Sequence, residues 1–161
     1  MSNFRRSWSE VGERAQLPQK QAFTNSYLFS AVAPLSGESF HLMCFDEMDT
    51  TSQFLFLTEL KKQHSDTEVV VVWDNAPCHR PKLLRNIPGL TLINLPSYSP
   101  QLNPTERFFE EIRRATSNEI HETLADIEAR IEKTVKTFSE NTEAMKQLLG
   151  YEWIKKQMGY S

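Results

Sequence analysis

Cysteine is scarce in this sequence, and long apolar runs are absent from it. The two cysteines among 161 residues, Cys44 and Cys78, are too few for a disulfide framework, so we interpret both as reduced thiols. No segment reaches the roughly 18 consecutive apolar residues that a membrane span requires, and no signal-peptide pattern is present. These absences predict a cytoplasmic protein without a membrane partner.

The sequence also lacks the excess of positive charge that is typical of nucleic-acid-binding proteins. Its formal net charge is −3, which alone argues mildly against such a partner. The charge is nevertheless uneven, with basic residues around two motifs and acidic residues further on: Arg80, Lys82, Arg85, Arg107, Arg113 and Arg114 against Glu119, Glu122, Asp126, Glu128 and Glu132. This distribution fits either DNA on a basic face or two ordinary solvated faces.

The first motif follows a run of four valines. Val69 to Val72 are β-branched and apolar, which predicts a fully buried strand. Asp74 and Asn75 come just after this strand, and His79 lies five residues beyond Asp74. Open α/β sheets bind ligands at the carboxyl ends of their strands. Asp74 is therefore a candidate catalytic residue, and a turn or helix-capping role is the alternative.

The second motif, residues 95–106, has the sequence L-P-S-Y-S-P-Q-L-N-P-T-E and leads into a predicted helix. One interpretation is structural, because Asn103, Pro104 and Glu106 have the form of a capping box. The other is chemical, because Glu106 would be a second carboxylate beside Asp74. Hard divalent cations prefer carboxylate oxygens, so the pair predicts a metal site for phosphodiester chemistry.

The two motifs together resemble a known family. D-N-A-x-x-H at residues 74–79, followed by L-P-x-Y-S-P-x-L-N-P-x-E at residues 95–106, is similar to the DDE-superfamily endonuclease domain of mariner-like bacterial insertion-sequence transposases. Residues 7–13 (S-W-S-E-V-G-E) resemble a further segment of that family, which follows its first strand. In the family, the first catalytic Asp ends that strand. Here only residues 1–6 precede the segment, and they contain no acid.

The resemblance implies an α/β fold of the RNase H-like (ribonuclease H/integrase) type, a mixed sheet flanked by helices that lacks its first strand. From the local patterns we expect strands at 22–33, 39–45, 68–73 and 90–95, and helices at 51–63, 81–86, 103–115 and 119–138. Residues 1–138 would form the partial catalytic domain and residues 139–161 a helical tail. The missing strand would leave a slot between the hairpin and the valine-rich strand.

The resemblance also implies the chemistry. Two Mg²⁺ or Mn²⁺ ions would promote cutting and joining of DNA, with Asp74 bridging both ions and Glu106 binding one. Asn75 would orient Asp74 or contact a phosphate, and His79 would contact the scissile region or brace its loop. The implied DNA partners are transposon ends and target DNA.

With one of three carboxylates absent, we expect the chain alone to be inactive, unless an upstream transposase segment or a second copy completes it. A helix-turn-helix domain would also lie upstream. Two alternatives stay open: a non-catalytic transposase-derived module that binds DNA or protein, and a stand-alone nuclease in which Asp46 or Glu47 replaces the first Asp.

Overall fold

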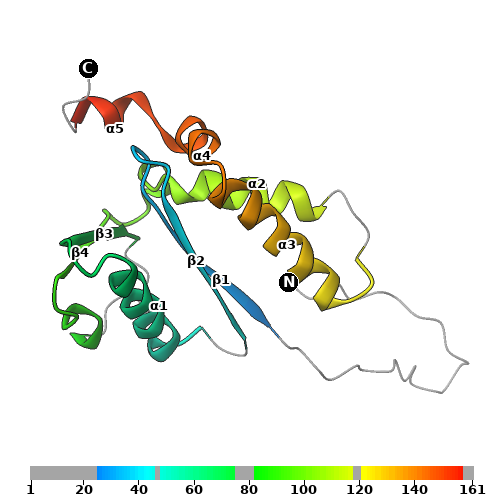
Figure 1. Ribbon diagram of the computed structural model, residues 1–161, viewed down its shortest axis with the longest axis horizontal. Coiled ribbons are helices and arrows are strands. Elements are labelled where there is room, and N and C mark those ends of the chain that lie inside the picture. The colour runs from blue at the N-terminus through cyan, green and yellow to red at the C-terminus, as the bar shows by residue number, and fades with distance from the viewer. Residues whose placement is uncertain (1–24, 46–47, 75–81, 118–120, 158–161) are drawn as a thin grey trace, which may run out of the picture.

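The computed structural model describes residues 25–45, 48–74, 82–117 and 121–157, and it is a mixed α/β structure with two small sheets (Figure 1). Strands β1 (Ser26–Val32) and β2 (Ser39–Phe45) form an antiparallel hairpin in which Ser26 pairs with Phe45 and Val32 with Ser39. Gly37 closes the turn with φ +74°, and a Cβ there would meet the backbone oxygen of Thr142 at 2.1 Å. The turn therefore requires glycine, both for its backbone conformation and for its packing.

Strands β3 (Val69–Trp73) and β4 (Leu90–Asn94) form the second sheet, a parallel pair linked through the short helix η2 (Lys82–Arg85). The expectation of a fully buried valine strand is wrong. Val70 and Val72 are 58% and 51% exposed, because only the opposite face of the pair, with Val69, Val71 and Trp73, packs into a core.

Helix α1 (Thr50–Gln63) packs against both sheets. It begins at a capping box, in which Ser52 N donates to Asp49 Oδ1 (2.8 Å) and Asp49 N donates to Ser52 Oγ (3.1 Å). Its buried Phe56 and Leu57 form a core with Leu84, Ile87 and Leu90, against which side chains of all four strands pack. Among the described strands, however, β1 pairs with β2 and β3 with β4, and no strand joins the two sheets.

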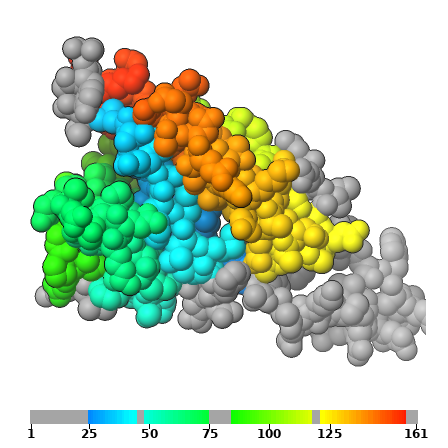
Figure 2. All heavy atoms as spheres, viewed as in Figure 1, coloured from blue at the N-terminus to red at the C-terminus, as the bar shows by residue number. Residues whose placement is uncertain are grey.

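The other face of the hairpin is covered by helices from the second half of the chain: α2 (Thr105–Ser117), α3 (Leu124–Ser139) and α4 (Thr142–Leu149), followed by α5 (Glu152–Gln157). Phe108 and Ile112 of α2 and Met145 and Leu149 of α4 form this second core. Figure 2 shows the hairpin between the α1 side of the molecule and helices α3 and α4.

Helix α3 begins at Leu124, later than residue 119 where the periodic pattern predicted its start. The cause is a capping box, in which Asp126 N donates to Thr123 Oγ1 (3.2 Å) and Thr123 N donates to Asp126 Oδ2 (2.9 Å). The part of the tail that the structure describes forms two short helices, with a break at Gly150. Within the described ranges, none of the helices is long and apolar enough to cross a membrane.

Candidate active site

Asp74 lies immediately beyond β3, at the carboxyl edge of the parallel pair. Trp73 is in register with Asn94, and the backbone N–H of Leu95 donates to the carbonyl of Trp73 (2.7 Å). This bond extends the hydrogen-bond ladder to the last residue of β3. The backbone position of Asp74, the next residue, is therefore fixed by the sheet. The side chain of Asp74 is exposed. A carboxylate therefore stands where the sequence predicted it.

An asparagine that the sequence analysis did not select supports this edge. Asn94, the last residue of β4, accepts a hydrogen bond from Arg85 Nη2 (3.0 Å) and donates a long one to the backbone oxygen of Asp74 (3.5 Å). The contact brings a guanidinium to the same edge as the Asp74 backbone. In the sequence, Asn94 could have been selected only because it ends the strand that follows the valine strand. Its proximity to Asp74 depends on the parallel register, which the sequence did not reveal.

Glu106 lies in the first turn of α2, and the geometry around it does not form the capping box that its spacing predicted. The side-chain oxygen of Asn103 does accept from the backbone N–H of Thr105 (3.1 Å). The reciprocal bond is missing, because the backbone N–H of Asn103 donates to Pro100 O (2.9 Å) instead of to Glu106. Glu106 is half-buried as a residue, and among the residues that the structure describes its carboxylate has no hydrogen-bonding or ion-pairing partner.

The residue after Glu106 is the cation Arg107. Arg107 donates from Nε to the Tyr151 hydroxyl (3.1 Å), and its guanidinium lies 5.9 Å from the centre of the Tyr151 ring. The hydrogen bond to Tyr151 raises the pKa of Arg107 above its ordinary value, and Glu110 contributes at 3.8 Å. About half of the Arg107 side chain is exposed (54%). It can therefore meet an anionic ligand near the first turn of α2.

The other predicted site residues fall outside the described part of the chain. Asn75 and His79 lie in the gap at 75–81, and Asp46 and Glu47 lie in the gap at 46–47. Among the described residues, no three acidic, histidine or cysteine side chains gather into a group that could hold a metal ion. The described candidate ligands are therefore Asp74, immediately after β3, and Glu106, in the first turn of α2.

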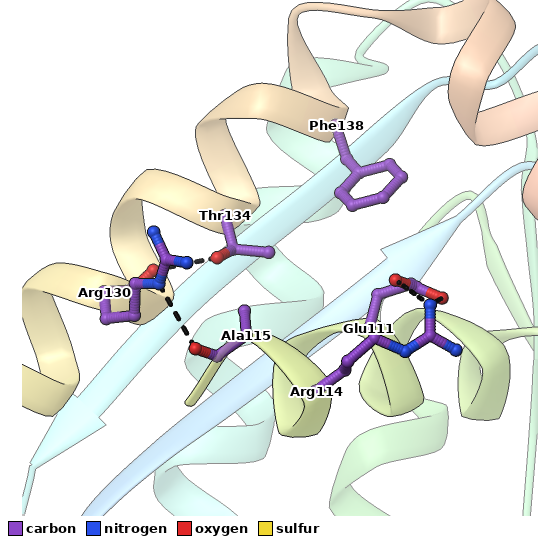
Figure 3. Close-up of a pocket in the computed structure, with 6 residues that line it drawn as sticks. All are labelled: Glu111, Arg114, Ala115, Arg130, Thr134 and Phe138. Carbon is purple, nitrogen blue, oxygen red and sulfur yellow. Dashed lines mark hydrogen bonds and ion pairs between the residues drawn. The ribbon is translucent and has the colours of Figure 1, made fainter. Parts of the chain in front are cut away.

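A pocket of about 270 Å³ lies elsewhere, between α2 and α3 (Figure 3). Arg114 is paired there with Glu111 through bonds of 2.8 and 3.0 Å, and Arg130 Nε donates to the backbone oxygen of Ala115 (3.2 Å). The pocket is at the C-terminal half of α2, whereas Glu106 is in the first turn. It is therefore separate from the candidate site.

Comparison with protein families decides the relationship. The family described as DDE superfamily endonuclease matches residues 1–128, a span that includes both Asp74 and Glu106. The chain belongs to the DDE superfamily of endonucleases. Membership implies a nuclease of the transposase or integrase type, with DNA as its substrate. Neither the curated proteins nor the solved structures contain a match to this chain.

The core around α2 includes residues beyond the matched span. Helices α4 and α5 follow residue 128, yet α4 contributes Met145 and Leu149 to the same core as Phe108 of α2. Tyr151, which holds Arg107, lies beyond the match as well. The packing of these later residues therefore supports the helix that carries Glu106.

Proposed function

We propose that this chain is the catalytic portion of a mariner-like, insertion-sequence DDE transposase, with Asp74 and Glu106 as two of its metal ligands. The observation that carries the proposal is the Glu106 carboxylate, which has no partner among the described residues even though its spacing matches a capping box. Its oxygens are not buried, and no cap or ion pair occupies them among the described residues. The carboxylate is therefore available to a metal ion.

The available donors suit Mg²⁺ or Mn²⁺, because both are carboxylates and hard divalent cations prefer oxygen ligands. Asp74 is exposed at the strand edge and Glu106 lies at a helix start. Both carboxylates would therefore be accessible to a metal ion. The ions would activate a water or hydroxyl nucleophile and stabilise the leaving oxygen of a phosphodiester. Arg85, at the strand edge of Asp74, and Arg107, which follows Glu106 in α2, would bind the flanking DNA phosphates. Asn75 and His79 keep the roles that the resemblance implies.

We further propose that the site is completed by a strand inserted between β1 and β3, as in the RNase H-like arrangement. Helix α1 packs against both sheets, yet no described strand links them. The added strand would carry the first Asp and come from an upstream transposase segment or a second copy.

The test is a thermal-shift titration with Mn²⁺. The wild-type unfolding temperature is expected to rise with Mn²⁺ concentration, because ligand that binds only the folded state stabilises it. Asp74→Ala and Glu106→Gln should abolish the rise, since each removes a ligand. Glu110→Gln, one turn further along α2, and Asp66→Ala, in the turn before β3, are matched controls that should keep it.

A flat wild-type response would instead favour the second candidate, a non-catalytic module that binds DNA or protein. This second candidate is consistent with the described residues, among which no three potential ligand side chains form a group that could hold a metal ion. Nicking of plasmid DNA with Mg²⁺ supplies the second readout. On the present proposal the chain alone nicks little, and efficient nicking that Asp74→Ala abolishes would show that a complete site is already present.

A further inference from the structure

Tyr98 is the most exposed large apolar side chain in the described part of the chain. Its relative exposure is 101%, so the ring extends fully into solvent. The other exposed large apolar side chains among the described residues keep a third or more of their surface covered by neighbours. A fully exposed aromatic ring contributes nothing to the core, and folding therefore does not explain its presence.

The backbone at Tyr98 is also unusual. Its φ angle is +60°, in the left-handed region, where Tyr98 is the single non-glycine residue among those described. A side chain with a Cβ is disfavoured in this conformation, and glycine or asparagine normally occupies it. Residues held in such conformations cluster at functional sites, where the surrounding structure enforces them.

The surrounding turn is fixed at both ends to the elements of the candidate site. On one side, Leu95 N donates to Trp73 O (2.7 Å), next to Asp74. On the other, Leu102 N donates to Ser99 O (3.1 Å) within the short helix η3 (Pro100–Leu102) that leads to Glu106. The prolines at 96 and 100 restrict the backbone further. Tyr98 is therefore presented rigidly between the strand edge of Asp74 and the helix of Glu106.

We propose that Tyr98 stacks on an unpaired nucleobase next to the phosphodiester that the site cleaves. This inference rests on the proposed function, because it takes DNA as the substrate. An uncharged aromatic ring offers a flat apolar surface, which suits the face of a base better than a phosphate. Within a duplex, the base faces are covered by their neighbours. The base that Tyr98 meets is therefore unstacked, as bases at a strand end or a nick can be.

The experiment measures binding of the wild-type chain and Tyr98 variants to a single-stranded oligonucleotide containing 2-aminopurine, and to the duplex of the same sequence. Fluorescence anisotropy reports affinity, and quenching of 2-aminopurine reports stacking. Tyr98→Gly should weaken binding to the single strand by roughly tenfold or more and abolish the quenching. Binding to the duplex should change by less than about twofold, because contacts to the phosphates carry it.

Thermal unfolding is a separate readout. If Tyr98 had a purely structural role, Tyr98→Gly would lower the thermal midpoint. Because glycine adopts a positive φ without strain, Tyr98→Gly should leave the thermal midpoint unchanged or raise it by roughly 2–4 °C. Tyr98→Phe and Tyr98→Trp should keep single-strand affinity and quenching, since the ring and not the hydroxyl makes the contact.

The outcomes separate this inference from the proposed function. Single-strand binding by Tyr98→Gly within about twofold of wild type would overturn the stacking role and leave the endonuclease proposal standing. Equal losses on single strand and duplex, or a loss in Tyr98→Phe as large as in Tyr98→Gly, would also overturn it. A wild-type chain that binds neither DNA would remove the DNA substrate, and with it both proposals.

Discussion

His41 is a partly buried imidazole that lies between the hairpin and α2, outside the candidate active site. Its Nδ1 contacts Ser30 Oγ (2.9 Å), its ring centre lies 4.8 Å from that of Phe108, and its Nε2 is buried without a hydrogen-bond partner. Burial lowers the pKa of His41 from 6.5 to about 4. The folded state therefore holds this side chain neutral, and protonating it would place an uncompensated charge beside an aromatic core.

The first prediction concerns the pH dependence that follows from His41. Because its pKa is lower in the folded state, the unfolded chain binds the proton more readily. The stabilisation is fully present above about pH 6.5 and is lost as the pH falls toward 4, by at most about 3 kcal/mol. Urea denaturation from pH 7.5 to 4.5 should show this loss of unfolding free energy in the wild type. In His41→Gln, the free energy of unfolding should depend less on pH over the same range.

His64→Gln is the matched control for that measurement. His64 is the residue that ends α1, and it does not lie in either core. If His41→Gln and wild type lost stability in parallel across this pH range, the proposed role of His41 in acid sensitivity would be refuted.

Helix α4 is an element whose importance the sequence pattern understated, because the helix is only eight residues long. In the structure, Met145 and Leu149 are fully buried against Phe108 of α2. The helix starts at Asn141, whose side-chain oxygen accepts from Ala144 N (3.0 Å). It is therefore a component of the core that supports α2, and thereby Glu106.

The second prediction compares two leucines in this helical layer. Leu149→Ala should lower the free energy of unfolding by about 2–5 kcal/mol, because it leaves a cavity in a closed core. Leu124→Ala, at the exposed start of α3, should change it by less than about 1 kcal/mol. Chemical denaturation of both variants measures the difference. Equal losses would mean that α4 does not pack as described.

At the scale of the whole molecule, net charge and local charge point in opposite directions. The net charge of −3 disfavours DNA, whereas Arg85 lies at the strand edge of Asp74 through Asn94, and Arg107 follows Glu106 in the first turn of α2. Binding of a polyanion depends on the cations that reach its phosphates, and each such contact releases counterions. The positions of these two arginines should therefore influence DNA affinity more than the net charge of the chain does.

The third prediction tests that balance through the salt dependence of DNA binding. The slope of log K against log salt should fall by about 1 for Arg85→Gln and by about 1 for Arg107→Gln, since each removes one phosphate contact. Lys133→Gln, an exposed position of α3, should leave the slope unchanged. A slope that responded equally to all three would indicate diffuse attraction instead of a DNA-binding face.

The whole molecule also has two separate cores, one on each face of the hairpin. Helix α1, β3 and β4 share the first core, while α2, α3 and α4 share the second. The hairpin contributes alternate side chains to both, because successive residues of a strand point to opposite faces. The two sheets are thus joined through side-chain packing within the described chain, and the proposed additional strand would join them through backbone hydrogen bonds.

Much of the local structure could be predicted from the sequence. The hairpin, α1, the valine strand and the helix bearing Glu106 all formed near their predicted positions, because β-branched runs and apolar periodicity act over a few neighbouring residues. Errors arose where a cap moved a boundary, as Thr123 did for α3. The family could also be identified from the sequence, because its motifs are short, ordered and contiguous.

By itself, the sequence determined which segments become strands and helices, and which residues follow them, including Asp74 after β3 and Glu106 at the start of α2. The tertiary structure alone decided that one face of β3 stays exposed, that Glu106 does not close a capping box and that Asn94 meets Asp74. The physical reason is distance along the chain. Secondary structure reflects neighbouring residues, whereas burial, polar pairing and the use of a carboxylate depend on contacts between segments that only folding brings together.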